Sequence, residues 1–134
     1  MTKPVQPIPS IFVYEQGGFG VSSKLELIKG AFYKTPKFEQ TALKLGQPSM
    51  EKWISFGYFL DQLHAWDWKP HYINSSVMDG TQWSLNIEYM DGRIISSSGS
   101  NAYPSILDAE YQDGPKKSLD WELFQASLAW LIKS

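Results

Sequence analysis

The chain has 134 residues, close to the commonest size of one domain, and we expect residues 1–134 to form a single domain. Its composition, 43% hydrophobic and 19% charged, is that of a globular protein, and the absence of cysteine excludes disulfides and thiolate metal sites. No apolar run reaches the length of about 18 residues that a bilayer requires, and MTKPVQPIPS lacks the apolar core of a signal peptide. We therefore expect a cytoplasmic protein that has no membrane partner.

The net charge of −2 is unevenly distributed along the chain. Residues 1–44 carry six lysines and three glutamates, a charge of +3, whereas residues 45–134 carry eleven acidic and six basic residues, a charge of −5. An acidic two-thirds disfavours nucleic acid as a ligand and favours a basic partner. Solvated surfaces without any partner also carry imbalances of this size.

The first third of the chain predicts two strands. Ile11–Tyr14 is rich in β-forming residues and ends at the turn sequence GGFG. Residues 21–33 predict a second strand, in which Gly30 is either a bulge or a second turn. The stretch 36–46 shows weak helical spacing and is assigned to neither class.

Two helices are predicted, each with a serine as its N-terminal cap. The first runs from Pro48 to about Ala65 and is capped by Ser49. Its apolar stripe is so broad that the helix is covered on more than one side or presents aromatics outward. The second runs from about Leu119 to Lys133 and is capped by Ser118. One apolar face of this helix consists of Leu119, Leu123, Ala126 and Trp130, and it is widened by Phe124, Leu128 and Leu131.

The segment 79–104, DGTQWSLNIEYMDGRIISSSGSNAYP, predicts a β-hairpin. Polar residues alternate in it with the apolar series Trp83, Leu85, Ile87 and Tyr89, as a half-buried strand requires. A two-residue turn at Asp91–Gly92 would place Gln82 opposite Asn101 and Ser84 opposite Gly99. A short edge strand after Pro70 precedes the hairpin. The order ββαβββα predicts an α+β domain, in which an antiparallel sheet of about five strands packs two main helices on one face.

Two groups of side chains are candidates for binding. The polar base of the hairpin would gather short side chains around a small molecule, namely Asp79, Thr81, Gln82, Ser100, Asn101 and Tyr103. The alternative is that Asp79 and Asn101 bond their own backbone in Asx-turns. An acidic loop around an aromatic anchor has the character of a partner-binding rim, namely Asp108, Glu110, Tyr111 and Asp113. A solvated loop explains these four residues equally well.

Signals of catalysis are weak. His64 and His71 are the only histidines, and their separation matches no standard metal spacing. With Asp61 or Asp67 either histidine would make a metal or acid–base pair, but a structural or exposed histidine is the more common case. The chain has neither a G-x-S-x-G elbow nor a cysteine nucleophile. We therefore expect no enzyme, no metal and no cofactor.

The motif DGTQW…SGSNAYP resembles one that recurs in small, uncharacterised bacterial proteins, over about 26 residues. The profile of the whole chain, small, acidic and without a catalytic signature, is similar to that of immunity proteins of bacterial toxin delivery systems, including contact-dependent inhibition. This resemblance implies an immunity-type protein that binds a cognate toxin, often a basic nuclease, and neutralises it by occlusion. A small-molecule binding module that uses the hairpin base is the alternative, and an enzyme that uses a histidine is a third hypothesis.

Overall fold

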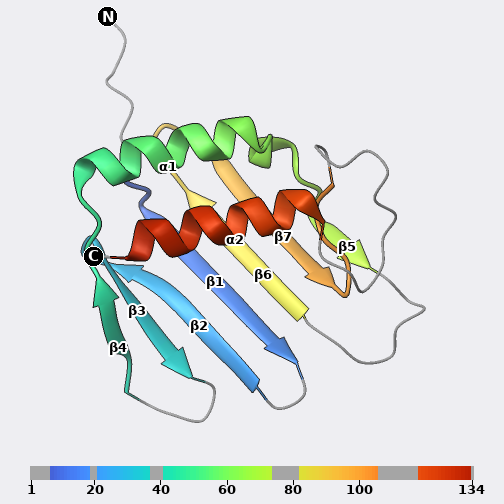
Figure 1. The fold of residues 1–134 in the computed structure, drawn as a ribbon, viewed down its shortest axis with the longest axis horizontal. Coiled ribbons are helices and arrows are strands. Elements are labelled where there is room, and N and C mark those ends of the chain that lie inside the picture. The colour runs from blue at the N-terminus through green and yellow to red at the C-terminus, as the bar shows by residue number, and fades with distance from the viewer. Residues whose placement is uncertain (1–6, 19–20, 37–40, 74–81, 106–117, 134) are drawn as a thin grey trace, which may run out of the picture.

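The computed structural model describes residues 7–18, 21–36, 41–73, 82–105 and 118–133. They form one seven-stranded sheet with two α-helices on one of its faces, a two-layer α+β fold (Figure 1). The elements are β1 (Ile11–Gly18), β2 (Val21–Ile28), β3 (Ala31–Pro36), β4 (Leu43–Gly46), α1 (Met50–Gln62), a short 3-10 turn η1 (Ala65–Asp67), β5 (His71–Ile73), β6 (Gln82–Glu88), β7 (Ile94–Ser100) and α2 (Leu119–Ile132).

The sheet has the order β4-β3-β2-β1-β6-β7-β5. All neighbours are antiparallel except β5, which runs parallel to β7 at the edge of the sheet. The α+β class is confirmed, whereas the expectation of about five strands is wrong because the sheet has seven. Neither α1 nor α2 is long and apolar enough to cross a membrane.

The two additional strands come from residues 29–46. Lys29 and Gly30 have positive φ angles of 51° and 82° and form a two-residue turn between β2 and β3. Of the two alternatives for Gly30, the turn is therefore correct. The unassigned stretch that follows contains β4, which pairs with β3 through Leu43 and Lys44. Its four residues are too few for a period of two to be recognised against weak helical spacing.

The β6–β7 hairpin is confirmed, but its predicted register is wrong by one residue. Gln82 faces Ser100 and not Asn101. The cause is a three-residue loop, closed by a hydrogen bond from the Tyr89 N–H to the Arg93 carbonyl oxygen at 2.9 Å. Gly92 takes the left-handed position of this loop with φ 98°, which is the usual geometry of a three-residue hairpin.

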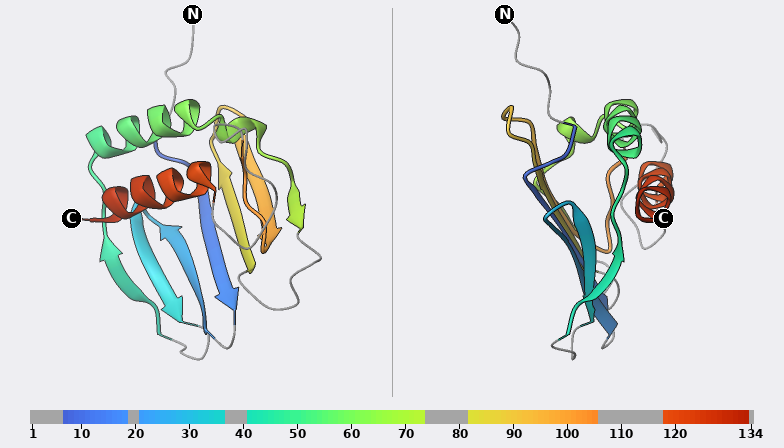
Figure 2. Two further views of the ribbon diagram at one scale, coloured as in Figure 1. Left: turned by 45° about the vertical axis from the view of Figure 1, so that its right-hand side comes forward. Right: turned by 90° about the vertical axis from the view of Figure 1, so that its left-hand side faces the viewer.

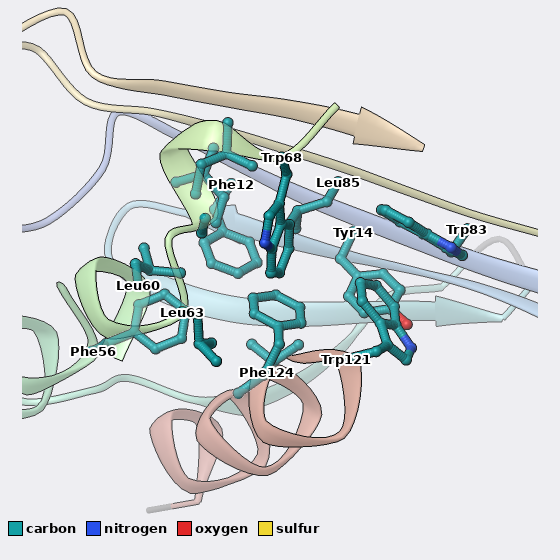
Figure 3. Packing of buried hydrophobic residues seen from close by; sticks show 14 of the residues in the cluster. Phe12, Tyr14, Phe56, Leu60, Leu63, Trp68, Trp83, Leu85, Trp121 and Phe124 are labelled. Atoms are coloured by element: carbon teal, nitrogen blue, oxygen red, sulfur yellow. The ribbon is translucent and has the colours of Figure 1, made fainter. Parts of the chain in front are cut away.

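The hydrophobic core lies between the sheet and the helix layer, which Figure 2 shows edge-on in its right-hand view. The alternation predicted for this segment is confirmed, because three apolar side chains of β6 and the tyrosine that follows the strand are buried: Trp83, Leu85, Ile87 and Tyr89. Figure 3 shows Trp121 and Phe124 of α2 directed towards the sheet, where they meet Tyr14 of β1. Four of the six tryptophans are buried in this core, so the aromatic surplus mainly serves packing.

Helix α2 buries a different face from the one that the sequence singles out. Its buried apolar residues are Trp121, Phe124, Leu128 and Leu131. The apolar stripe along its other side remains exposed, and it consists of Leu119, Leu123, Ala126 and Trp130. A helix that is apolar on nearly every side is normally covered on both faces. Here the sheet covers only one of them.

Candidate functional site

The hairpin base does not gather its predicted residues on one surface. Gln82 and Ser100 are cross-strand neighbours, and because they alternate with the buried Trp83 and Gly99 they lie on the face of the sheet opposite the core. Asn101 and Tyr103 are buried, and Asn101 has a left-handed backbone with φ 56°. Asp79 and Thr81 lie outside the described residues. The ligand-binding role of this set stays a prediction.

The motif has a structural role that its residues make plain. Trp83 and Gly99 are direct cross-strand partners, and the Trp83 Nε1–H donates to the Ala102 carbonyl oxygen at 2.9 Å. The Trp83 ring is stacked on Tyr103 at an interplanar angle of 8° and contacts Trp121 with centroids 4.3 Å apart. A Cβ atom on residue 99 would lie 2.2 Å from Trp83 Nε1, so the indole occupies the space that only glycine leaves.

The same segment also fixes the start of α2. Ser118 is fully buried, donates its hydroxyl to the Pro104 carbonyl oxygen and accepts from the Trp121 N–H at 3.2 Å. Further along α2, the Gln125 amide donates to the Tyr14 hydroxyl of β1 at 2.9 Å. These contacts determine which side of α2 meets the sheet and therefore which side faces solvent.

The two histidines lie in different local settings. His64 is exposed and ends α1 with a left-handed backbone, φ 53°. His71 is also exposed, and its Nδ1 lies 2.7 Å from the Ser98 hydroxyl on the open face of the sheet. That hydroxyl also lies 3.3 Å from the Pro70 carbonyl oxygen, to which it donates. Which of His71 and Ser98 donates across the shorter contact depends on the tautomer of the imidazole ring.

Metal ligands and strongly charged pairs are few in the described part of the chain. No three His, Asp or Glu side chains there are grouped as metal ligands. At the tip of the hairpin, Arg93 packs over Tyr89 and Trp66, with centroid distances of 4.4 and 5.1 Å, and bonds to Asp91 at 2.9 Å. These bonds lower the pKa of Asp91, and burial raises the pKa of Tyr89 to about 12. The cluster holds the hairpin tip against η1, and its two charged groups, Arg93 and Asp91, are paired with each other.

In the described part of the chain, a hollow lies between the outer sides of α1 and α2. It has a volume of about 400 Å³ and is lined by Phe59, Gln62, Leu63, Leu123, Ala126, Ser127 and Trp130. We call it the interhelical groove. Leu119, Leu123 and Trp130 keep 47%, 43% and 39% of their surface exposed. Other large apolar side chains of the chain, such as Ile73 and Ile94, are equally exposed, but Leu123 and Trp130 are gathered on one helix face at a hollow, and clustered apolar surface of this kind marks interaction sites.

One end of the interhelical groove is held by contacts between the two helices. Phe59 and Trp130 meet edge to face, with centroids 5.7 Å apart and planes at 89°. Lys52 of α1 lies over the Trp130 ring at 5.3 Å and donates to the Trp130 carbonyl oxygen at 3.1 Å and to that of Lys133. The ammonium group thereby satisfies carbonyls at the C-terminal end of α2, where the helix dipole also favours a cation. The groove is thus a built feature of the fold.

The helices that form the groove are acidic. Between them α1 and α2 carry Glu51, Asp61, Asp120 and Glu122 against Lys52, a charge of −3. Asp120 is buried, and Lys52 is engaged with the end of α2, so the exposed charges near the groove are mainly carboxylates. A surface with an apolar centre and an acidic margin is complementary to a partner surface with an apolar centre and a basic margin.

The residues predicted as a partner-binding rim, Asp108, Glu110, Tyr111 and Asp113, lie outside the described residues. Comparison with protein-family models, with curated proteins and with solved structures finds no match for this chain. The inference of function therefore depends on the surfaces of this molecule. The interhelical groove was the site that sequence reasoning missed, although its signal is present, because α2 has apolar residues on almost every side.

Proposed function

We propose that this protein binds a basic partner protein through the interhelical groove and neutralises it by occlusion, as an immunity protein neutralises its toxin. The observation that carries the proposal is the second apolar stripe of α2, which the fold leaves uncovered over the groove. Covering Leu123 and Trp130 would remove apolar surface from water, and an exposed tryptophan in a groove is the kind of residue that dominates binding energies.

The charge of the helix layer selects the kind of partner. Two copies of this chain that met through their grooves would bring together two surfaces on which the helices expose Glu51, Asp61 and Glu122 against Lys52, a charge of −2 each, which opposes self-association. A basic partner gains from the same charges, both in the rate of encounter and in the discrimination against acidic proteins. The −5 charge of residues 45–134 acts in the same direction. This supports a basic toxin as the partner.

Co-expression with the product of the neighbouring gene, which the proposal expects to contain a toxin domain, tests the proposal. We expect the wild-type chain to restore growth and to bind the toxin, with an affinity that falls as salt is raised. Leu123→Asp places a charge in the groove at a position that is 43% exposed, so it should abolish rescue while lowering the free energy of unfolding by about 1 kcal/mol. Ile94→Asp is the matched control, because Ile94 is similarly exposed on the other face of the sheet.

The possible outcomes separate clearly. Rescue by wild type and Ile94→Asp, with none by Leu123→Asp, supports the groove as the neutralising surface. Equal rescue by both variants contradicts the groove. A neighbouring gene that encodes no toxin, or a toxin that the wild-type chain neither binds nor neutralises, contradicts the function itself.

A further inference from the structure

The walls of the interhelical groove offer side chains but almost no backbone hydrogen-bonding groups. Both walls are α-helices, in which backbone N–H and C=O groups pair within the helix. The polar side chains of the lining are Gln62 and Ser127, and the Ser127 hydroxyl donates to the Phe124 carbonyl oxygen at 2.8 Å. Among the described lining residues, the Gln62 amide therefore offers donors and acceptors, the Trp130 indole offers one N–H donor, and the Ser127 hydroxyl offers only acceptor lone pairs.

This lining discriminates between the shapes that a bound segment can take. An extended strand laid in the groove would turn peptide groups towards apolar walls, at a cost of about 1–3 kcal/mol for each group left unpaired. A helix satisfies its own peptide groups and presents only side chains. The apolar lining is thus compatible with a docked helix and unfavourable to a docked strand.

The spacing of the lining residues fits a third helix as well. On α2 they recur at helical intervals, Leu123, Ala126, Ser127 and Trp130, and on α1 they are Phe59, Gln62 and Leu63. Ala126 and Ser127 are small, and they lie between the larger Leu123 and Trp130. This arrangement leaves a seat in the middle of α2, where a large side chain from a partner helix would fit as a ridge enters a groove.

We infer that the segment docked in the interhelical groove is an amphipathic helix, with large apolar side chains on one face and lysine or arginine on its flanks. The apolar face enters the seat beside Ala126, and the basic flanks lie along the exposed carboxylates of α1 and α2, which are Glu51, Asp61 and Glu122. The inference rests on the proposed function, since it describes the part of the partner that this groove would hold.

Two synthetic peptides of identical Leu and Lys composition test the inference on the intact protein. In the first, leucines have helical spacing; in the second, leucine and lysine alternate, which gives an amphipathic strand. We expect the helical peptide to bind with micromolar affinity, at least tenfold more tightly than the alternating one, with chemical-shift changes confined to α1 and α2. Equal binding, or tighter binding of the alternating peptide, overturns the inference, and the common charge of the two peptides controls for non-specific attraction.

A matched pair of substitutions places the peptide. Ala126→Trp fills the seat and should weaken the helical peptide at least tenfold, whereas Ala129→Trp adds the same side chain at an exposed position of α2 that does not line the groove. Equal losses in the two variants contradict a seat at Ala126. A dimer of the wild-type chain that Ala126→Trp dissociates would make a second copy the occupant, and it would also overturn the inference.

The same variant separates this inference from the proposed function. If the helical peptide is preferred but Ala126→Trp neutralises the toxin as well as the wild type does, the groove binds a helix but is not the neutralising surface. If the helical peptide is preferred but the wild-type chain does not neutralise the toxin, the inference holds and the proposed function fails. If the peptides are not distinguished but Ala126→Trp abolishes neutralisation, the function holds and the helical partner is wrong.

Discussion

Replacing Gly99 by alanine tests the structural explanation of the DGTQW…SGSNAYP motif. The added Cβ would lie 2.2 Å from Trp83 Nε1 and 2.3 Å from the Ala102 carbonyl oxygen, the two atoms joined by the buried indole hydrogen bond. Distances this short force the ring or the backbone to move. Because Trp83 also packs on Tyr103 and Trp121, the shift would spread into the core.

The magnitude follows from three contributions. Overpacking of a filled core costs about 1–3 kcal/mol. Losing the bond between Trp83 and Ala102 leaves buried polar groups unpaired, at about 1–3 kcal/mol. Alanine also lowers the conformational entropy of the unfolded chain, which raises the free energy of unfolding by about 0.4–1 kcal/mol and offsets part of the loss. We expect Gly99→Ala to lower the free energy of unfolding by about 3 kcal/mol, which is about 10 °C in Tm for a domain of this size.

Urea unfolding followed by tryptophan fluorescence measures this change. Gly57→Ala is the matched control, since Gly57 lies within α1 and a Cβ there meets no atom within 4 Å. That substitution should stabilise the protein by about 0.5–1 kcal/mol, because alanine has the higher helix propensity. If Gly99→Ala costs less than about 1 kcal/mol, or no more than Gly57→Ala, the packing explanation of the motif is wrong.

Three further predictions concern buried polar groups. Tyr89→Phe should leave the free energy of unfolding unchanged or raise it, since the buried Tyr89 hydroxyl has no partner among the described residues. Tyr14→Phe should lower it by about 1 kcal/mol, because the substitution removes bonds to Gln16 and Gln125. Chemical denaturation compares the two variants, and a larger loss for Tyr89→Phe would refute the assignment. Burial raises the pKa of both tyrosines from 10.0 to about 12, so the folded state holds these protons more tightly than the unfolded state. The contribution of the two protonated tyrosines to the free energy of unfolding is complete below pH 10 and is lost as the pH rises towards 12. In an absorbance titration two tyrosines should therefore ionise late, together with unfolding. Ionisation of all tyrosines near pH 10 in the folded protein would contradict this. Ser118→Ala should lower the free energy of unfolding by about 2 kcal/mol, because it removes a helix cap and a buried bond to Pro104. The control Ser49→Ala removes an exposed cap and should cost no more than about 1 kcal/mol. Equal losses in thermal or urea unfolding would argue against a contribution of the Ser118–Pro104 hydrogen bond.

Local patterns in the sequence were sufficient to predict which side chains are buried where a strand has one buried face. The alternation from Trp83 to Tyr89 predicts which side chains of β6 are buried, because a period of two has only one register against a core. The turn that follows was harder to predict, since Asp91–Gly92 is a signal for a two-residue loop. The Asp91 carboxylate instead accepts from the Arg93 N–H at 3.1 Å, and Met90 is included in a three-residue loop.

Helix α2 shows why the candidate site was beyond a local pattern. With apolar residues on nearly all sides, periodicity cannot decide whether Trp121 and Phe124 or Leu123 and Trp130 face the sheet. Long-range contacts decide it: Trp121 packs on Trp83 of β6, and the buried Ser118 bonds to Pro104. Neither contact can be read from the helix alone, because both join segments whose proximity results from the fold.

The motif and the groove are therefore two parts of one arrangement. Gly99 leaves space for the Trp83 indole, and the Trp83 ring packs against Trp121 of α2. Because this contact places Trp121 against the sheet, the opposite side of α2 faces solvent. In this chain of contacts the buried residues of the motif, Trp83 and Gly99, act on the orientation of the helix, while the exposed stripe carries no polar signature. It follows that Gly99→Ala should weaken partner binding only to the extent that it unfolds the protein or rotates α2, whereas Leu123→Asp should weaken binding with the fold intact.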